Sequence, residues 1–170
     1  MLIRTNSACG RWWAANPRQA VNTASMTGSI DPTRPQFDAF KNLPRDEPIH
    51  MLNLIRLRPL ADYPADHPNH GKGMTGLDAY RAYGRDSAEV FKRVGGRQVW
   101  AGRPDVVLTG PTDERWDIAF IAEYPGGGAF LAMVTDPDYR EHVKHRQAAV
   151  EDSRLIRMAP FTELGEGFGE

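Results

Sequence analysis

The sequence predicts an α+β domain in which two helices cover one face of a four-stranded antiparallel sheet. The first observation is a run of β-branched and aromatic residues over 116–124, which Pro125 and three glycines end. The second is the helical pattern that follows and leads to another strand at 154–159. The third is a strand, a helix and a strand over 49–101. The resulting order is that of the ferredoxin-like βαββαβ fold.

The composition is that of an ordinary globular protein. Of the 170 residues, 41% are hydrophobic and 25% are charged, and this length suits one domain with appendages. The net charge of −1 gives no field that attracts nucleic acid, and no apolar run is long enough to span a bilayer. The lone Cys9 cannot form an internal disulfide, which fits a reducing compartment. We expect a cytoplasmic protein without nucleic-acid or membrane partners.

Two segments precede the predicted domain. The first contains arginines but no acidic residue and no apolar period, so we interpret it as disordered or as a mis-called extension, with Met26 as the true start. The second is a polar arm, in which prolines leave room for one helical turn at 37–40. The predicted boundaries are 1–25 for the extension, 26–48 for the arm, 49–161 for the domain and 162–170 for a flexible tail.

The first predicted strand, 49–58, carries a polar residue among apolar ones. Asn53 shares a face with Met51 and Ile55, because side chains alternate along a strand. If it is buried, its amide must be hydrogen-bonded. A structural bond to a neighbouring segment and a contact to a ligand both explain it.

The connection over 59–74 is long for a compact domain. Such connections are typically lids, binding loops or disordered segments. His67 and His70 lie near acidic residues in it, but their spacing matches no known metal site, and hydrated loops collect such residues. We therefore expect no metal and no cofactor.

A helix is predicted over 75–94, with Thr75 as its cap. Its apolar stripe includes Leu77, Tyr80 and Gly84, and the glycine is where we expect a close approach to the sheet. Tyr83 lies on the same side. Core packing with a satisfied hydroxyl is the simpler role for both tyrosines, and contact with a ligand is the alternative.

The next two strands define the two faces of the sheet. A strand at 97–101 is predicted to bend at 102–104 and to continue at 106–108. In the strand over 116–124, every second residue from Ile118 is assigned to the helices. Asp117 and Glu123 then point to the other face, because a carboxylate is costly in a dry core.

Arg146 is the unexpected residue of the second helical region, 139–152. It lies on an apolar stripe, where an arginine needs a partner. We expect its guanidinium either to reach solvent or to form an ion pair with an acid such as Asp117 or Glu123; a bound anionic or carbonyl ligand is the alternative. Two histidines flank it, and we expect both on the solvated side, with Glu141 paired to His145.

Several short motifs in this order resemble one family. They are Tyr80-x-x-Tyr83, Gly95-Gly96, Glu123-Tyr124-Pro125, and Asp136-Pro137-Asp138-Tyr139 with Arg146. The resemblance is to the domain-of-unknown-function family 1330 and covers about residues 49–161. It implies membership of the dimeric α/β-barrel superfamily. That superfamily includes cofactor-free monooxygenases, lactone isomerases and haem enzymes, whereas the family itself has no established activity to transfer.

A sheet that is apolar on both faces needs a cover on each. Helices cover one face, and a second copy of the sheet would cover the other, giving a homodimer with an enclosed, mostly apolar pocket. Three hypotheses follow: a metal-free enzyme of isomerase or monooxygenase type acting on a carbonyl or aromatic compound, a small-molecule binding or sensing module, and a structural dimer with a filled barrel. The candidate residues for an apolar or carboxylate ligand are Asn53, Tyr80, Tyr83, Asp117, Glu123 and Arg146.

Overall fold

The computed structural model describes residues 28–160. Their elements are α1 (Arg34–Lys41), β1 (Ile49–Leu57), α2 (Gly76–Arg93), β2 (Arg97–Gly102), β3 (Ile118–Tyr124), α3 (Gly127–Thr135), α4 (Pro137–Ala149) and β4 (Val150–Met158). None of the helices in this range is long and apolar enough to cross a membrane. The predicted extension, 1–25, and the whole of the predicted tail, 162–170, lie outside the described residues.

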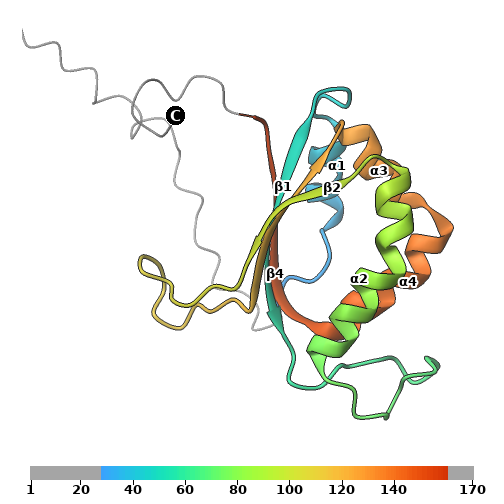
Figure 1. Cartoon of the computed structure of the whole chain (residues 1–170), viewed down its shortest axis with the longest axis vertical. Helices are drawn as coiled ribbons and strands as arrows, with labels where there is room; N and C mark the ends of the chain where they lie inside the picture. The colour runs from blue at the N-terminus through green and yellow to red at the C-terminus, as the bar shows by residue number, and fades with distance from the viewer. Residues whose placement is uncertain (1–27, 161–170) are drawn as a thin grey trace, which may run out of the picture.

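The four strands form one sheet in the order β2-β3-β1-β4, and all neighbouring strands are antiparallel. Helices α2 and α4 lie side by side on one face of this sheet (Figure 1). No described element covers the opposite face, which we call the open face. This topology confirms the predicted ferredoxin-like α+β fold.

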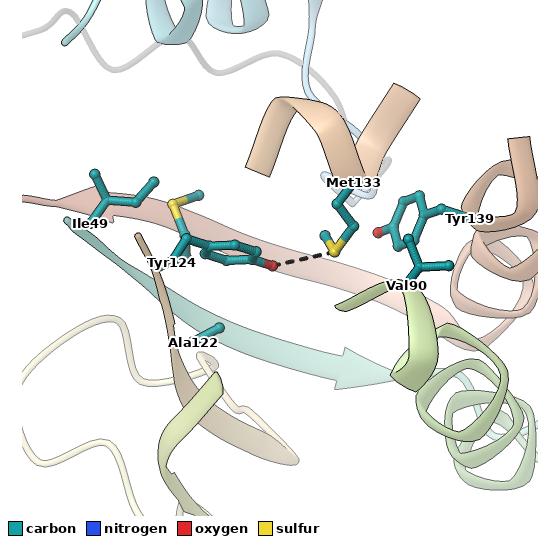
Figure 2. Close-up of a cluster of buried hydrophobic side chains, with 7 residues drawn as sticks. Ile49, Val90, Ala122, Tyr124, Met133 and Tyr139 are labelled. Atoms are coloured by element: carbon teal, nitrogen blue, oxygen red, sulfur yellow. Dashed lines mark hydrogen bonds between the residues drawn. The ribbon is translucent and has the colours of Figure 1, made fainter. Parts of the chain in front are cut away.

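The core lies between the sheet and the helices, because alternate residues of the strands point that way. Ile49, Met51 and Ile55 of β1 are buried there, as the period of two predicted. Figure 2 shows one end of this core, where the Tyr124 hydroxyl donates a 3.6 Å hydrogen bond to the sulfur of Met133. The assignment of alternate β3 residues to the helices is confirmed by this packing.

Helices α2 and α4 meet through small residues. Ala79 of α2 is buried in one core cluster with Ala148 and Ala149 of α4. The predicted stripe of α2 was wrong in part, since Leu77 is 42% exposed and Gly84 faces open space. The close approach is made instead by Gly76, where a Cβ atom would overlap the carbonyl oxygen of Arg58.

Two predicted strand boundaries were also wrong. Strand β2 ends at Gly102, because β3 begins only at Ile118 and residues 106–108 have no strand to pair with. The irregularity in β2 lies between Gln98 and Trp100 and not at the predicted bend. The last helix ends at Ala149 and the last strand begins at Val150, earlier than the predicted helix end at 152 and strand start at 154. The fully buried Val150 already pairs with Leu57 of β1.

The arm before the domain packs against it. Thr33 and Gln36 form a capping box that starts α1, so the helix is longer than the single turn predicted. The segment before it follows β4: the Ser29 amide donates to the Asp152 carboxylate at 2.7 Å, and the Ser153 hydroxyl donates to the Ser29 carbonyl at 2.7 Å. Residues 28–31 are therefore part of the packed structure.

Candidate functional site

Cross-strand pairing arranges the open face in rows of side chains. Directly opposed residues of antiparallel strands point to the same side of a sheet. The first row is Arg97, Glu123, His50 and Met158; the second is Trp100, Ile121, Leu52 and Ile156; the third is Gly102, Ala119, Leu54 and Arg154. A polar row thus borders an apolar row.

The polar row is a connected hydrogen-bonded group. Arg97 donates two hydrogen bonds to the Glu123 carboxylate, of 2.8 Å from Nε and 2.9 Å from Nη2. His50 Nε2 lies 3.2 Å from the second oxygen of the same carboxylate. The hydrogen bond from Arg97 holds the pKa of Glu123 below its usual range, and His50 adds to this effect. Glu123 is therefore ionised and a poor proton acceptor, and its role is to orient Arg97 and His50.

The ionised carboxylate fixes the tautomer of His50. Because a carboxylate only accepts hydrogen bonds, Nε2 must carry the hydrogen, which leaves Nδ1 of the neutral ring as an acceptor. Within residues 28–160 no hydrogen bond occupies Nδ1. The ring is partly exposed on the open face, next to the apolar row. A histidine held in this way can accept a proton from a bound molecule.

The apolar row is exposed to an unusual degree for large side chains. Trp100 is 53% exposed and Ile156 is 47% exposed, at opposite edges of the sheet. Leu52 and Ile121 lie between them and are partly exposed. A contiguous apolar surface of this kind marks a site of interaction.

A second polar group lies inside the core, among the helices. The hydroxyls of Tyr83 and Tyr139 are 2.9 Å apart, and the rings of Tyr80 and Tyr83 are 5.6 Å apart. Burial raises the pKa of Tyr80 and of Tyr139 well above the usual value, so both remain protonated. The two predicted tyrosines are thus brought together, on the side of the sheet that carries the helices.

Arg146 lies in the same layer and is 8% exposed. Its Nη1 donates to the Ile30 carbonyl at 2.6 Å and its Nη2 to the Ser153 hydroxyl at 3.1 Å, while the Asp31 carboxylate is 3.8 Å away. The predicted ion pair with Asp117 or Glu123 was wrong. Those carboxylates lie elsewhere, and Arg146 finds its partners in the arm, at Ile30 and Asp31, and in β4, at Ser153.

The six predicted site residues therefore divide into separate groups. Asn53 faces the core, where its amide donates to the Met51 carbonyl at 2.9 Å, and it shares this layer with the tyrosines and Arg146. Glu123 is on the open face. Asp117 lies at the far end of the sheet, where it accepts the Leu57 amide at 2.7 Å. His50 and Arg97 were not predicted, although their place opposite Glu123 would have identified them once the strand register was known.

The histidine next to Arg146 is also placed differently from the prediction. His145 Nδ1 lies 2.7 Å from the Tyr63 hydroxyl, and its Nε2 lies 3.4 Å from the Asp86 carboxylate. Glu141 pairs with Lys144 at 2.6 Å instead. Tyr63 is buried, so this contact holds the long 59–74 connection against α2 and α4. Within residues 28–160 no three histidine, cysteine or acidic side chains come together as a metal site would require.

Comparison with known proteins identifies relatives. The model of the Domain of unknown function (DUF1330) family matches residues 73–159. The crystal structure of RPA0582, a protein of unknown function from Rhodopseudomonas palustris, is 57% identical, with a TM-score of 0.73 over 80% of this chain and 99% of that one. Its methylated form is 56% identical, with a TM-score of 0.76 over 82% and 100%.

More distant structures are also similar. A dimeric protein of unknown function and ferredoxin-like fold from Bacteroides fragilis is 15% identical, with a TM-score of 0.42 over 66% of this chain and 95% of that one. No curated protein matches the sequence significantly. The family match and the identity to RPA0582 agree with the motifs noted in the sequence, and the chain belongs to the DUF1330 family.

Proposed function

We propose that this protein is a homodimeric enzyme that moves protons on an apolar carbonyl or aromatic compound, held between the open faces of two sheets. The single observation that carries the proposal is the position of His50. It is oriented by an ionised carboxylate, its Nδ1 has no hydrogen-bond partner among residues 28–160, and it borders an apolar row that could bind a ring.

A second copy of this chain is the simplest cover for the open face. The face carries exposed apolar side chains, chiefly Trp100 and Ile156, and a two-fold axis would place the same apolar row of a second copy against them. Stable interfaces of this kind bury about 1,600 Å² or more in total. The pocket would be the space left between the apolar row of one subunit and the apolar row of the other, and the polar rows would lie at its edge.

The proposed chemistry is general base catalysis. His50 Nδ1 takes a proton from a carbon next to the substrate carbonyl, the C–H bond breaks, and its electron pair moves into an enolate. Glu123 stabilises the imidazolium that forms, and Arg97 keeps Glu123 ionised. If the imidazolium exchanges its proton with solvent, delivery of the solvent proton to the same carbon gives isotope exchange. In a conjugated enolate, delivery to a different carbon gives isomerisation. In a monooxygenase-type reaction, the same carbanion would add dioxygen, the oxidant, to form a hydroperoxide. Loss of water, with cleavage of the O–O bond and of a second C–H bond on that carbon, would leave a new carbonyl.

Proton exchange of 2-indanone in D₂O, followed by NMR, tests this chemistry. We expect wild-type protein to accelerate exchange and His50→Gln to lose roughly 100-fold or more of that effect. His142→Gln, on α4, is the matched control and should keep it. Full activity of His50→Gln would refute His50 as the base. Binding of the ketone without exchange would favour the binding or sensing module.

Light scattering tests the dimer separately. The wild-type protein should have twice the mass of one chain, and Ile156→Glu should shift it towards the monomer, because it places a charge in the apolar row. Val106→Glu, at an exposed loop position, is the control. A wild-type monomer at micromolar concentration would refute the enclosed pocket. A dimer that binds no small molecule would support the structural role.

A further inference from the structure

A separate groove lies at the end of the sheet opposite the polar row. The ends of β1, β2 and β3 and the start of α2 form it, and its volume is about 930 Å³. That volume lies within the range of sites that bind small molecules. Leu57, which lines the groove, is seven positions after His50 in β1, a distance of about 23 Å along the strand. The groove is therefore distinct from the proposed catalytic site.

The polar side chains of the groove are mainly cationic. Three arginines line it, Arg58, Arg103 and Arg115, against a single carboxylate, that of Asp117. This carboxylate is already engaged, because it accepts the Leu57 amide at 2.7 Å and lies 3.8 Å from Arg115. The groove thus has an excess of positive charge.

The guanidinium of Arg58 is the least satisfied of the three. Its Nε atom is buried and has no hydrogen-bond partner within residues 28–160. Arg103 and Arg115 have only loose partners, at 3.8 Å from Asp105 and 3.5 Å from Glu151. The Arg58 side chain is half-buried and lines the groove, and no described residue accepts a hydrogen bond from its guanidinium, so its Nη groups are available to an acceptor supplied by a ligand.

The remaining wall of the groove is apolar. Leu57 and Ile118 form part of it, and Leu77 stands at the rim with 42% of its surface exposed. An apolar ligand in the groove would cover the exposed part of Leu77 at the start of α2. The groove therefore combines arginine side chains with an apolar surface formed by Leu57, Leu77 and Ile118.

We propose that this groove binds an organic carboxylate with an apolar body. The carboxylate would accept two hydrogen bonds from the planar guanidinium of Arg58, with Arg115 adding charge, and the body would lie against Leu77 and Ile118. A free phosphate lacks the body, and a neutral aromatic compound lacks the anion. Both should bind more weakly than the carboxylate.

NMR titration of the full chain with 2-naphthoate tests the proposal. We expect amide shifts at residues 57, 58 and 60, at 75–77 and at 115–118. Arg58→Gln should lower the affinity roughly tenfold, and Arg58→Lys should lower it less, because lysine keeps the charge but cannot donate two parallel hydrogen bonds. Leu77→Glu should also weaken binding, because it puts a carboxylate at an exposed rim position that does not support the fold. Arg140→Gln, exposed on α4, is the matched control.

The comparison ligands make the outcome decisive. Equal binding of 2-naphthamide would refute the role of the arginines, and equal binding of inorganic phosphate would refute the role of the apolar wall. Shifts confined to the open face would assign the ligand to the other site. His50→Gln should bind 2-naphthoate as the wild type does, so this proposal and the catalytic one can fail independently.

Discussion

The guanidinium group of Arg146 donates a 2.6 Å hydrogen bond to the backbone carbonyl of Ile30, 116 positions earlier in the chain. Through this bond, and a second to Ser153, one buried side chain joins α4, β4 and the arm. The charge is satisfied mainly by neutral oxygens, with Asp31 at 3.8 Å on the solvent side. Arg146 is thus explained as a structural residue, without a ligand.

Arg146→Met should lower the free energy of unfolding by about 2–3 kcal/mol, measured by urea denaturation. The substitution keeps the apolar part of the side chain but leaves the Ile30 carbonyl and the Ser153 hydroxyl without their charged donor. Arg140→Met, at an exposed position of the same helix, should change stability by no more than about 0.5 kcal/mol. Equal effects of the two substitutions would show that the bonds of Arg146 contribute nothing.

Truncation separates the contribution of the arm from that of the preceding segment. Removal of residues 1–25 should leave the melting temperature unchanged. Removal of residues 1–31 should lower it, because the carbonyls of Ser29 and Ile30 then no longer accept bonds from Ser153 and Arg146. We expect a loss of about 1–3 kcal/mol for the longer deletion. If both truncated proteins unfolded at the same temperature, the bonds accepted by Ser29 and Ile30 would not contribute to stability.

Two glycines of α2 should respond in opposite directions to substitution by alanine. Gly84→Ala should stabilise the protein by about 0.5–1 kcal/mol, since the position is helical and faces open space. Gly76→Ala should destabilise it by about 1–3 kcal/mol, since the new Cβ would overlap the Arg58 carbonyl, which is backbone and cannot rotate away. Calorimetry of the pair tests the packing of α2, and equal shifts would refute it.

The pH dependence of stability should include a contribution from His145. Its burial lowers its pKa below the unfolded value of about 6.5, with Asp86 opposing the shift. The folded state therefore binds this proton less readily, so the contribution is present above about pH 6.5 and is lost as the pH falls towards the folded pKa. His145→Gln should lose less stability than the wild type between about pH 7.5 and about pH 5. Parallel profiles for the two proteins would contradict the assignment.

Local patterns were enough to predict much of the fold. The period of two that buries Ile49, Met51 and Ile55 also identified the helix side of β3, and turn residues separated the elements in the correct order. The family motifs agreed with this order. Such patterns depend only on neighbours along the chain, and for this reason they can be recognised without a structure.

The candidate site depended on relations that such patterns do not contain. The partner of Arg146 is a backbone carbonyl, a group that every residue has, so nothing in the sequence distinguishes Ile30. His50 and Glu123 are 73 positions apart and meet only through the register of two strands. The groove at Arg58 is built from chain segments around positions 58, 75, 102 and 116, which only the tertiary fold assembles.

The bulge at Val99 determines which residues of the edge strand reach the open face. Arg97 lies opposite Glu123 and Trp100 opposite Ile121, so two side chains three positions apart point the same way. If Val99 entered the regular alternation, one of these two side chains would turn over to the helix face, whereas loss of Val99 would leave both on the open face, two positions apart. Among homologues, the presence or absence of this bulge in a strand of the same length would therefore change which residues reach the open face while the domain keeps its fold.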